Sequence, residues 1–146
     1  NIGEEVFEEC SNLKNVMIPK TVINIGWNAF RGCSSLESII IPDTVTCINS
    51  GTFERCSSLK SIIIPGRVTE IGTFAFGECS SLENIVIPDT VTCIGYGAFE
   101  GCSSLQKIFI PDSVKECGNY VFERCDNLKS ISIPEKMPTS DNTFGG

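Results

Sequence analysis

The chain has 146 residues, about the length of one domain, with 41% apolar residues, 20% charged residues, a net charge of −7 and no histidine. The apolar share is too high for a disordered chain, and no apolar run approaches the roughly 20 residues of a membrane helix, so we expect no membrane insertion. The acidic balance argues against nucleic acid as a partner, because nucleic acid requires a basic footprint.

The sequence repeats every 23 residues without an insertion, and the pattern weakens only after Met137, where Phe144 comes one residue early. The residues that return six times at this spacing include Phe7, Phe30, Phe53, Phe76, Phe99 and Phe122, Cys10, Cys33, Cys56, Cys79, Cys102 and Cys125, and Pro19, Pro42, Pro65, Pro88, Pro111 and Pro134. We interpret residues 1–146 as a single solenoid, a fragment of a longer array, with partial coils at 1–18 and 135–146.

Within the unit formed by residues 42–64, the first expected element is a short extended piece around Val45 and Ile48. The next expected element is a tight corner, where glycine stands in most units and a side chain would interfere. Its glycines are Gly26, Gly72, Gly95 and Gly118. Phe53 and Cys56 follow three residues apart, which fits one turn of α-helix or 3₁₀-helix.

The second half of the unit predicts a strand. Ile62 and Ile64 alternate around Ile63, a period of two that is typical of a half-buried strand, and Pro65 ends it because proline cannot donate to a ladder. A lone unit has too few apolar residues to offset the entropy of ordering 23 residues. We therefore expect the units to stack about 4.8 Å apart, with their strands in one parallel sheet.

The string C-S-S-L-x-x-I-x-I-P-D-x-V-T-x-I-G-x-x-A-F, at residues 79–99 and with small changes elsewhere, resembles the BspA-like leucine-rich repeats. The expected fold is a β-rich α/β solenoid, a right-handed array of six 23-residue coils. The resemblance implies a parallel sheet on its concave face, with short strands and 3₁₀ turns on the convex side. The sequence departs from the family pattern at Asn49, Cys117 and Met137.

The resemblance also implies a function. Members of the family are surface proteins that adhere to host matrix proteins, host cells or other microbes, and no catalytic residues or cofactors come with them. It therefore implies a cell-surface or secreted protein that binds protein. The alternative is an intracellular scaffold or signalling-associated interaction module.

One residue per unit is predicted to point out of the strand face although it is apolar. We name these residues the strand-face row; they are Met17, Ile40, Ile63, Val86 and Phe109. Exposed apolar patches of this size tend to mark interaction sites, so the row is the predicted protein-binding surface. The alternative is that β-branched residues simply suit a sheet.

Charged and polar residues beside the row complete the predicted surface, and they include Glu37, Lys60, Glu83 and Lys107. The charges of Lys14, Glu37, Lys60 and Glu83 alternate in sign from unit to unit. Opposite charges on adjacent strands stabilise by only about 0.2–1 kcal/mol per pair, but they oppose a slip in register. We therefore favour a structural role for this alternation. A second charged row, which includes Glu8, Arg31 and Glu54, is expected to be a solvated convex surface.

Nine cysteines suggest disulfides or metal, yet both are disfavoured. Six of them form a column whose parallel side chains leave the Cβ atoms nearly 4.8 Å apart, whereas a disulfide requires about 3.8 Å. We expect these six to be small buried apolar residues. Cys47 and Cys93 are expected to be exposed thiols, and a metal site shared with Glu70 is conceivable but disfavoured without a C-x-x-C motif.

Enzymatic activity is not expected. Without histidine there is no Ser-His or Cys-His pair, and no phosphate-binding G-x-x-x-x-G-K motif is present. Neither end of the chain resembles the polar cap of a solenoid, so we also expect end-to-end self-association through uncapped coils.

Overall fold

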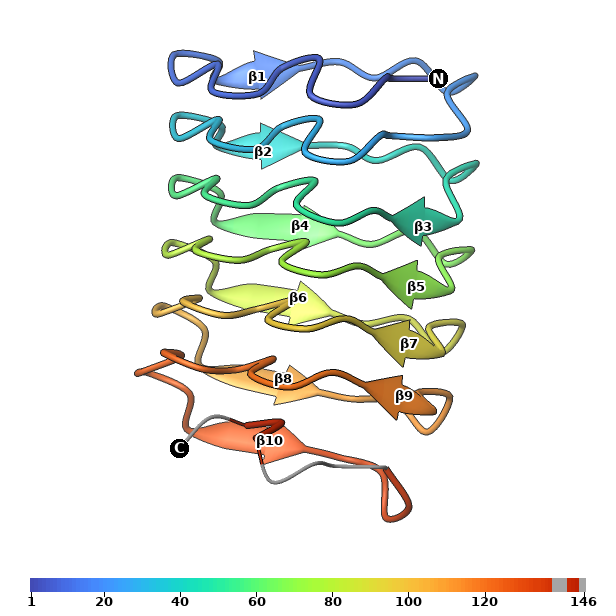
Figure 1. The fold of residues 1–146 in the computed structure, drawn as a ribbon, viewed down its shortest axis with the longest axis vertical. Helices are drawn as coiled ribbons and strands as arrows, with labels where there is room; N and C mark the ends of the chain where they lie inside the picture. Colours follow the sequence, from blue (N-terminus) through green and yellow to red (C-terminus); the bar gives the residue numbers. More distant parts are fainter. Residues whose placement is uncertain (138–141, 145–146) are drawn as a thin grey trace.

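Two rows of short parallel strands run along the molecule, one on each side of the coil (Figure 1). The computed structural model describes residues 1–137 and 142–144. The first row contains β1 (Asn15–Val16), β2 (Ser38–Ile39), β4 (Ser61–Ile63), β6 (Asn84–Val86), β8 (Lys107–Phe109) and β10 (Ser130–Ser132). The second row contains β3 (Cys47–Ile48), β5 (Glu70–Ile71), β7 (Cys93–Ile94) and β9 (Glu116–Cys117).

The strands confirm that the 23-residue units stack in phase. Every strand pairing among the described residues joins residues 23 positions apart, as in Ile62 with Ile85 and Ile71 with Ile94, and every pair is parallel. Five complete turns connect β1 to β10. The result is a parallel β-solenoid, while its right-handed coil and the concave placement of the first row stay predictions.

The first row is less continuous than a single six-stranded sheet. Its ladders join β1 to β2, β4 to β6, and β8 to β10, although β2 lies beside β4 and β6 beside β8. The second row forms one four-stranded sheet in the order β3-β5-β7-β9. The strands of the first row are only two or three residues long, so a small separation between coils is enough to interrupt a ladder.

The core is a set of columns that run along the axis of the coil. Phe76 is fully buried, and its ring centroid lies 5.6 Å from that of Phe53 and 5.5 Å from that of Phe99. The rings are nearly parallel, and the column continues to Phe144, which stands one residue early in the repeat but stacks 6.1 Å from Phe122. In the central coils, the leucine and inward isoleucine columns are buried in the same core.

The predicted helical turn is wrong, and so is the α/β label: the described residues contain no helix. Between the two strand rows, the backbone makes successive tight turns, as in the bond from Cys56 N to Phe53 O at 3.1 Å. Two positions in every coil have a positive φ, which breaks any helix after a few residues. They are Glu5, Asn28, Gly51, Phe74, Gly97 and Tyr120, and Glu9, Gly32, Arg55, Glu78, Gly101 and Arg124.

These turns still satisfy their backbone groups, because they bond to the next coil. Phe53 N donates to Ala75 O at 2.9 Å, and Phe76 N donates to Ala98 O at 2.9 Å. Hydrogen bonds therefore connect the coils around much of their circumference as well as through the strands.

The corner glycines are confirmed as positions where a side chain would interfere, because an added Cβ would meet the backbone of the preceding coil. A Cβ on Gly95 would lie 2.5 Å from the backbone nitrogen of Thr73 in the preceding coil, and no positive φ is involved. The glycines of this class therefore permit close approach of two backbones. Asn49 stands at the equivalent position in the third unit in place of glycine. Its Nδ2 donates a hydrogen bond to Ile25 O in the preceding coil at 2.6 Å.

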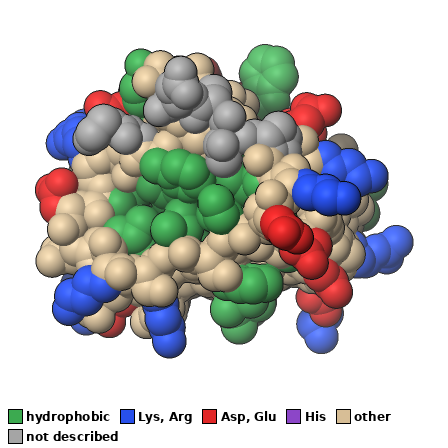
Figure 2. All heavy atoms as spheres, turned by 90° about the horizontal axis from the view of Figure 1, so that it is seen from below, with side chains coloured by type: hydrophobic (Ala, Val, Ile, Leu, Met, Phe, Trp, Pro, Cys, Tyr) green, Lys and Arg blue, Asp and Glu red, His purple; other side chains and the backbone are tan. Residues whose placement is uncertain are grey.

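The end coils are less buried than the central ones. Cys10 is exposed, against its prediction as a buried residue, and Ile131 and Ile133 are exposed in and beside β10. Each end coil has a neighbour on one side only among the described residues. Seen from the C-terminal end, apolar side chains fill the middle of the coil and charged side chains stand around its perimeter (Figure 2).

Candidate protein-binding surface

The strand-face row is exposed along its whole length. Met17 is 94% exposed, Ile63 84% and Phe109 62%, and Ile40 and Val86 lie between these values. The alternation within the strands explains this: in β4, β6 and β8 the middle residue is buried and the residues on either side are exposed. The sequence-based prediction of outward-facing residues is confirmed, and their role in binding stays a prediction.

The row combines apolar side chains with a neutral polar border. The residue that begins each strand of the first row is polar and exposed, as in Asn15, Ser38, Ser61, Asn84 and Ser130, and Lys107 is the one charged member. Ser38 Oγ lies 3.4 Å from Asn15 Oδ1, so neighbouring coils also bond across this border. A partner lying on the row would meet apolar groups flanked by hydrogen-bonding groups, as at the centre and rim of an interface.

Two shallow hollows lie along the row. One, of about 670 Å³, is bordered by Met17, Ile40, Pro19 and Pro42. The other, of about 370 Å³, is bordered by Val86 and Phe109, together with residues such as Lys107 and Ser132. Each hollow is large enough to receive a side chain from a partner.

The charged residues beside the row form no ion pairs with one another. Lys14, Glu37, Lys60 and Glu83 are all exposed, and none belongs to an ion pair in the part of the chain that the structure describes. Their backbones are connected, because Glu37 N donates to Lys14 O at 3.2 Å and Glu83 N to Lys60 O at 3.0 Å. The side chains therefore remain available to a partner.

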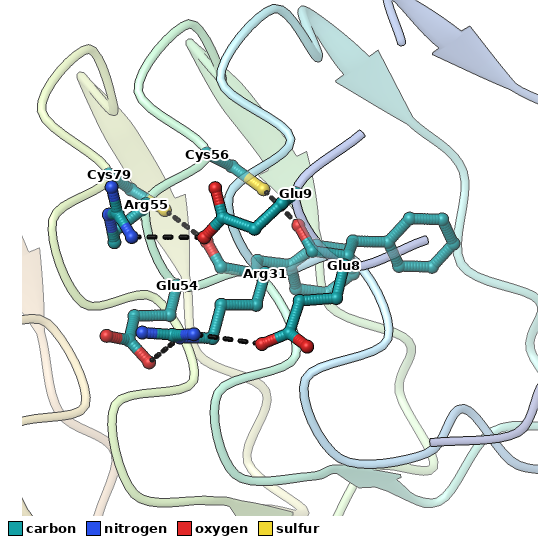
Figure 3. Close-up of polar contacts among 9 residues, drawn as sticks. Glu8, Glu9, Arg31, Glu54, Arg55, Cys56 and Cys79 are labelled. Carbon is teal, nitrogen blue, oxygen red and sulfur yellow. Dashed lines mark hydrogen bonds and ion pairs between the residues drawn. The ribbon is translucent and has the colours of Figure 1, made fainter. Parts of the chain in front are cut away.

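The ion pairs lie instead on a second surface, the charged ridge, which follows the tight turns. Arg31 Nη1 lies 2.9 Å from Glu8 Oε1, and Arg31 Nε lies 3.1 Å from Glu54 Oε2 (Figure 3). The hydrogen bond that Arg31 donates to Glu8 and the charge of Glu54 raise the pKa of Arg31. One guanidinium thus connects three successive coils.

Two further ion pairs each join residues that stand two coils apart, across the coil between them. Arg55 Nη1 lies 3.0 Å from Glu9 Oε1, and Arg124 Nη1 lies 2.6 Å from Glu78 Oε1, although 46 residues separate the partners of each pair. The coil between Glu9 and Arg55 carries Gly32, on which a Cβ would lie 2.6 Å from the Glu9 carboxylate. Glycine in the middle coil therefore leaves the space that the ion pair occupies.

The buried cysteines act as hydrogen-bond donors as well as small apolar residues. Cys56 Sγ donates to Phe30 O at 3.2 Å, and Cys79 Sγ donates to Phe53 O at 3.1 Å (Figure 3). Cys33, Cys102 and Cys125 make the equivalent bond. Burial is the main cause that raises the pKa of these thiols, to about 11 for Cys33 and well above the ordinary value for Cys79.

Cys47 and Cys93 are half-buried, which corrects their prediction as exposed thiols. Cys47 Sγ lies 3.5 Å from Asn49 Oδ1, and burial raises the pKa of Cys47 to about 11. The described residues contain no group of three His, Cys, Asp or Glu side chains placed to hold a metal ion, so Cys47, Glu70 and Cys93 do not assemble a site there.

An aromatic group that was not predicted from the sequence lies beside the charged ridge. Tyr96 contacts Phe74 on one side and Tyr120 on the other, both edge to face, and Trp27 stands at the position equivalent to Tyr96. A signal was present, because the single tryptophan and both tyrosines fall on two adjacent positions of the 23-residue repeat.

A search of the described residues for a helix that could cross a membrane finds none.

The repeat is similar to those of known proteins, both in sequence and in structure. The sequence pattern of the BspA type leucine rich repeat region matches residues 1–80 and 46–145, in six copies. No curated protein matches the chain significantly. Among solved structures, the chain is similar to a leucine-rich repeat protein from T. pallidum, with 36% identity, a TM-score of 0.89, and coverage of 93% of this chain and 64% of that one.

Two further bacterial proteins are similar as well. A leucine rich cell surface protein from Faecalibacterium prausnitzii is 38% identical over 97% of this chain and 38% of its own, with a TM-score of 0.83. A leucine-rich repeat protein from Bacteroides ovatus is 32% identical over 93% of this chain and 42% of its own, with a TM-score of 0.67. The chain therefore spans less than two thirds of each of these three proteins.

Proposed function

The chain belongs to the BspA-type leucine-rich repeat family, and from this premise we propose that it is a protein-binding module of a cell-surface or secreted adhesin-like protein. It is a leucine-rich repeat module, of a fold that generally serves protein interaction. Its partner binds along the strand-face row. The partner class favoured by the family resemblance is a host matrix or cell-surface protein.

The observation that carries the proposal is the exposure of the strand-face row. Five large apolar side chains on successive coils face solvent on one side of the molecule, where five polar residues would suit solvent better. Full burial of one such side chain contributes roughly 1.5–3 kcal/mol. Burial of five is comparable with the estimated 4–15 kcal/mol cost of associating two proteins.

The charged side chains beside the row provide a means of selecting the partner. Glu37, Lys60 and Glu83 are exposed, alternate in sign and have no ion-pair partner among the described residues. A partner with complementary charges at the spacing of the coils would gain attraction, and a partner in the wrong register would meet like charges. The row thus provides the binding energy, and the charges beside it determine how the partner is aligned along the coils.

The surface location is supported by the family resemblance and by the similar protein from F. prausnitzii, which is described as a cell surface protein. One observation favours the alternative of an intracellular scaffold or signalling-associated module. All nine cysteines are unpaired, and unpaired cysteines are commoner in reducing compartments. A leader and an anchor in the full-length gene would support the surface location, and a catalytic or signalling domain without them would support the scaffold.

The experiment is surface plasmon resonance against a panel of purified extracellular matrix proteins. The wild-type chain is compared with the double variant Ile63→Glu and Phe109→Glu, which places two charges in the strand-face row. We expect the wild type to bind a matrix protein and the double variant to lose binding, while circular dichroism and the melting temperature stay unchanged.

The matched control is Ile23→Glu with Trp27→Glu. These two residues are also exposed and apolar, at 61% and 58%, but they lie outside the row. The control variant should bind as the wild type does. Equal loss of binding in both variants, or the absence of any binding across the panel, would contradict the proposal.

A further inference from the structure

A second surface, separate from the strand-face row, combines aromatic rings with carboxylates. The rings of Phe74 and Tyr96 lie 5.4 Å apart at 73°, and those of Tyr96 and Tyr120 lie 5.4 Å apart at 66°. They stand on three successive coils, in the segments that follow β5, β7 and β9. Tyr96 is 43% exposed, and Phe74 and Tyr120 are half-buried.

The backbone holds these rings in an uncommon conformation. Phe74 has a φ of 50° and Tyr120 a φ of 58°, in the left-handed region where bulky residues are rare. Such conformations cost of order 1–3 kcal/mol and persist where the surrounding structure holds them. The ring of Phe74 leans over the next coil, because a Cβ on Gly97 would lie 2.4 Å from Phe74 Cε1.

Two carboxylates belong to the same turns as the rings. Glu100 N donates to Gly97 O at 3.0 Å, and Glu123 N donates to Tyr120 O at 3.2 Å. The same Cβ on Gly97 would lie 3.1 Å from Glu100 Oε2, so the carboxylate and the edge of the Phe74 ring flank one point in space. Desolvation is the main cause that raises the pKa of Tyr96, followed by the charges of Tyr120, Glu100 and Glu123. Both carboxylates therefore lie close enough to Tyr96 to act on its hydroxyl group.

These carboxylates differ from the others on the charged ridge. Glu8 and Glu54 share Arg31, Glu9 pairs with Arg55, and Glu78 pairs with Arg124. Among the described residues, Glu100 and Glu123 have no cation within ion-pair distance. The charge of Arg124, which pairs with Glu78, also acts on Glu100, so three carboxylates at this end of the ridge (Glu78, Glu100 and Glu123) have one nearby arginine among the described residues.

We propose that Phe74, Tyr96, Tyr120, Glu100 and Glu123 form an aromatic-acidic corner that binds arginine or lysine side chains of a basic polypeptide segment. The faces of aromatic rings attract cations, and the attraction is about 0.5–2 kcal/mol depending on desolvation. Carboxylates add charge-assisted hydrogen bonds to a guanidinium. The occupant follows from charge complementarity. Glu100 and Glu123, which have no ion-pair partner among the described residues, would neutralise the charge of an arginine or lysine side chain, and the three rings would contact its cationic group.

The corner acts independently of the strand-face row. It lies on the turns after the second strand row, whereas Ile63 and Phe109 lie in the first row. A single chain can therefore bind one partner through the strand face and a basic segment through the corner. Failure of one surface would leave the other testable.

The experiment is an NMR titration of the isotope-labelled chain with an octa-arginine peptide at about 0.15 M salt, where long-range charge effects are largely screened. We expect the largest shifts at the amides of Tyr96, Gly97 and Tyr120. Tyr96→Ala, and the double variant Glu100→Gln with Glu123→Gln, should each weaken binding at least about fivefold. Tyr96→Phe keeps the ring and should bind nearly as the wild type does.

Two controls test the position of the site. Glu70→Gln with Glu116→Gln removes the same charge from exposed positions in β5 and β9, and Phe109→Ala removes a ring from the strand-face row. Both should leave peptide binding unchanged. Equal weakening by the control charge variant, no effect of Tyr96→Ala, or shifts at Gly97 with a neutral oligosaccharide such as maltohexaose but not with the peptide, would overturn the proposal.

Discussion

Cys79 donates a hydrogen bond from its Sγ to the carbonyl oxygen of Phe53, 26 residues earlier in the chain, at 3.1 Å. The same carbonyl accepts the backbone N–H of Cys56 at 3.1 Å, so one oxygen connects a turn within its own coil to a thiol in the next. The equivalent thiols form a line of such bonds through the core. Cysteine at this position therefore connects coils, and its small size lets the coils stack closely.

This arrangement predicts the chemical reactivity of the thiols. Iodoacetamide should label Cys10 first, because it is exposed, whereas Cys56, Cys79 and Cys102 should stay unlabelled in the folded chain. These buried thiols have raised pKa values, and the thiolate is the reactive form. Peptide mass spectrometry after labelling, with and without urea, measures this. Rapid labelling of Cys79 without urea would contradict a buried column.

The phenylalanine column should dominate the stability of the coil. Phe76→Ala removes a fully buried ring that stacks on Phe53 and Phe99, and it should lower the free energy of unfolding by about 3–5 kcal/mol through lost transfer energy and a cavity. Phe109→Ala is the control on an exposed position and should cost less than about 1 kcal/mol. Urea unfolding of both variants measures the difference, and a cost below about 1 kcal/mol for Phe76→Ala would place that ring outside the core.

Close approach of neighbouring coils is tested at glycine. Gly95→Ala would place a Cβ 2.5 Å from Thr73 N and 2.6 Å from Gly72 C, so backbone would have to shift and the melting temperature should fall. Gly66 has nothing within 4 Å of the same added atom, so Gly66→Ala should be neutral or slightly stabilising, by up to about 1 kcal/mol. Thermal melts of the two variants provide the comparison, and equal melting temperatures would refute the close contact.

The carboxylate of Glu100 predicts a pH dependence. Burial, together with Glu123 and Glu78, raises its pKa above the ordinary 4.5, so the folded chain favours the protonated form. That stabilisation is complete below pH 4.5 and is lost as the pH rises through the folded pKa. Glu100→Gln should therefore raise the melting temperature at pH 7, and the gain should vanish below pH 4.5. A gain of the same size at both pH values would show that ionisation is not its cause.

The periodic positions were the part of the fold that the sequence could predict. Phe76 and Ile63 illustrate this, because a residue that repeats every 23 positions must meet its equivalents when the coils stack. The inward and outward faces of the strands follow from the alternation within Ile62, Ile63 and Ile64 alone. The parallel solenoid and the exposure of the strand-face row were predicted on these grounds and are confirmed.

The conformation of the turns was not predicted, because no single residue type marks their left-handed positions. The left-handed positions carry Gly51 and Gly97 in two coils but Phe74 and Tyr120 in others, so glycine did not reveal them. The role of Gly95 depends on its distance to the backbone of another coil, which no local pattern reports. The repeat positions of Tyr96 and Tyr120 were a signal for the aromatic group, but its contact with Phe74 and its closeness to Glu100 depend on turns that bring three coils together.

Crosslinking from a single position tests the strand-face row most directly. Benzoylphenylalanine in place of Ile63 reacts on illumination with whatever lies against the row, and the same group in place of Glu70 reports on the second strand row as a control. With the matrix protein identified by surface plasmon resonance, we predict a covalent adduct from position 63 and none from position 70. An adduct from position 70 with none from position 63 would contradict the account.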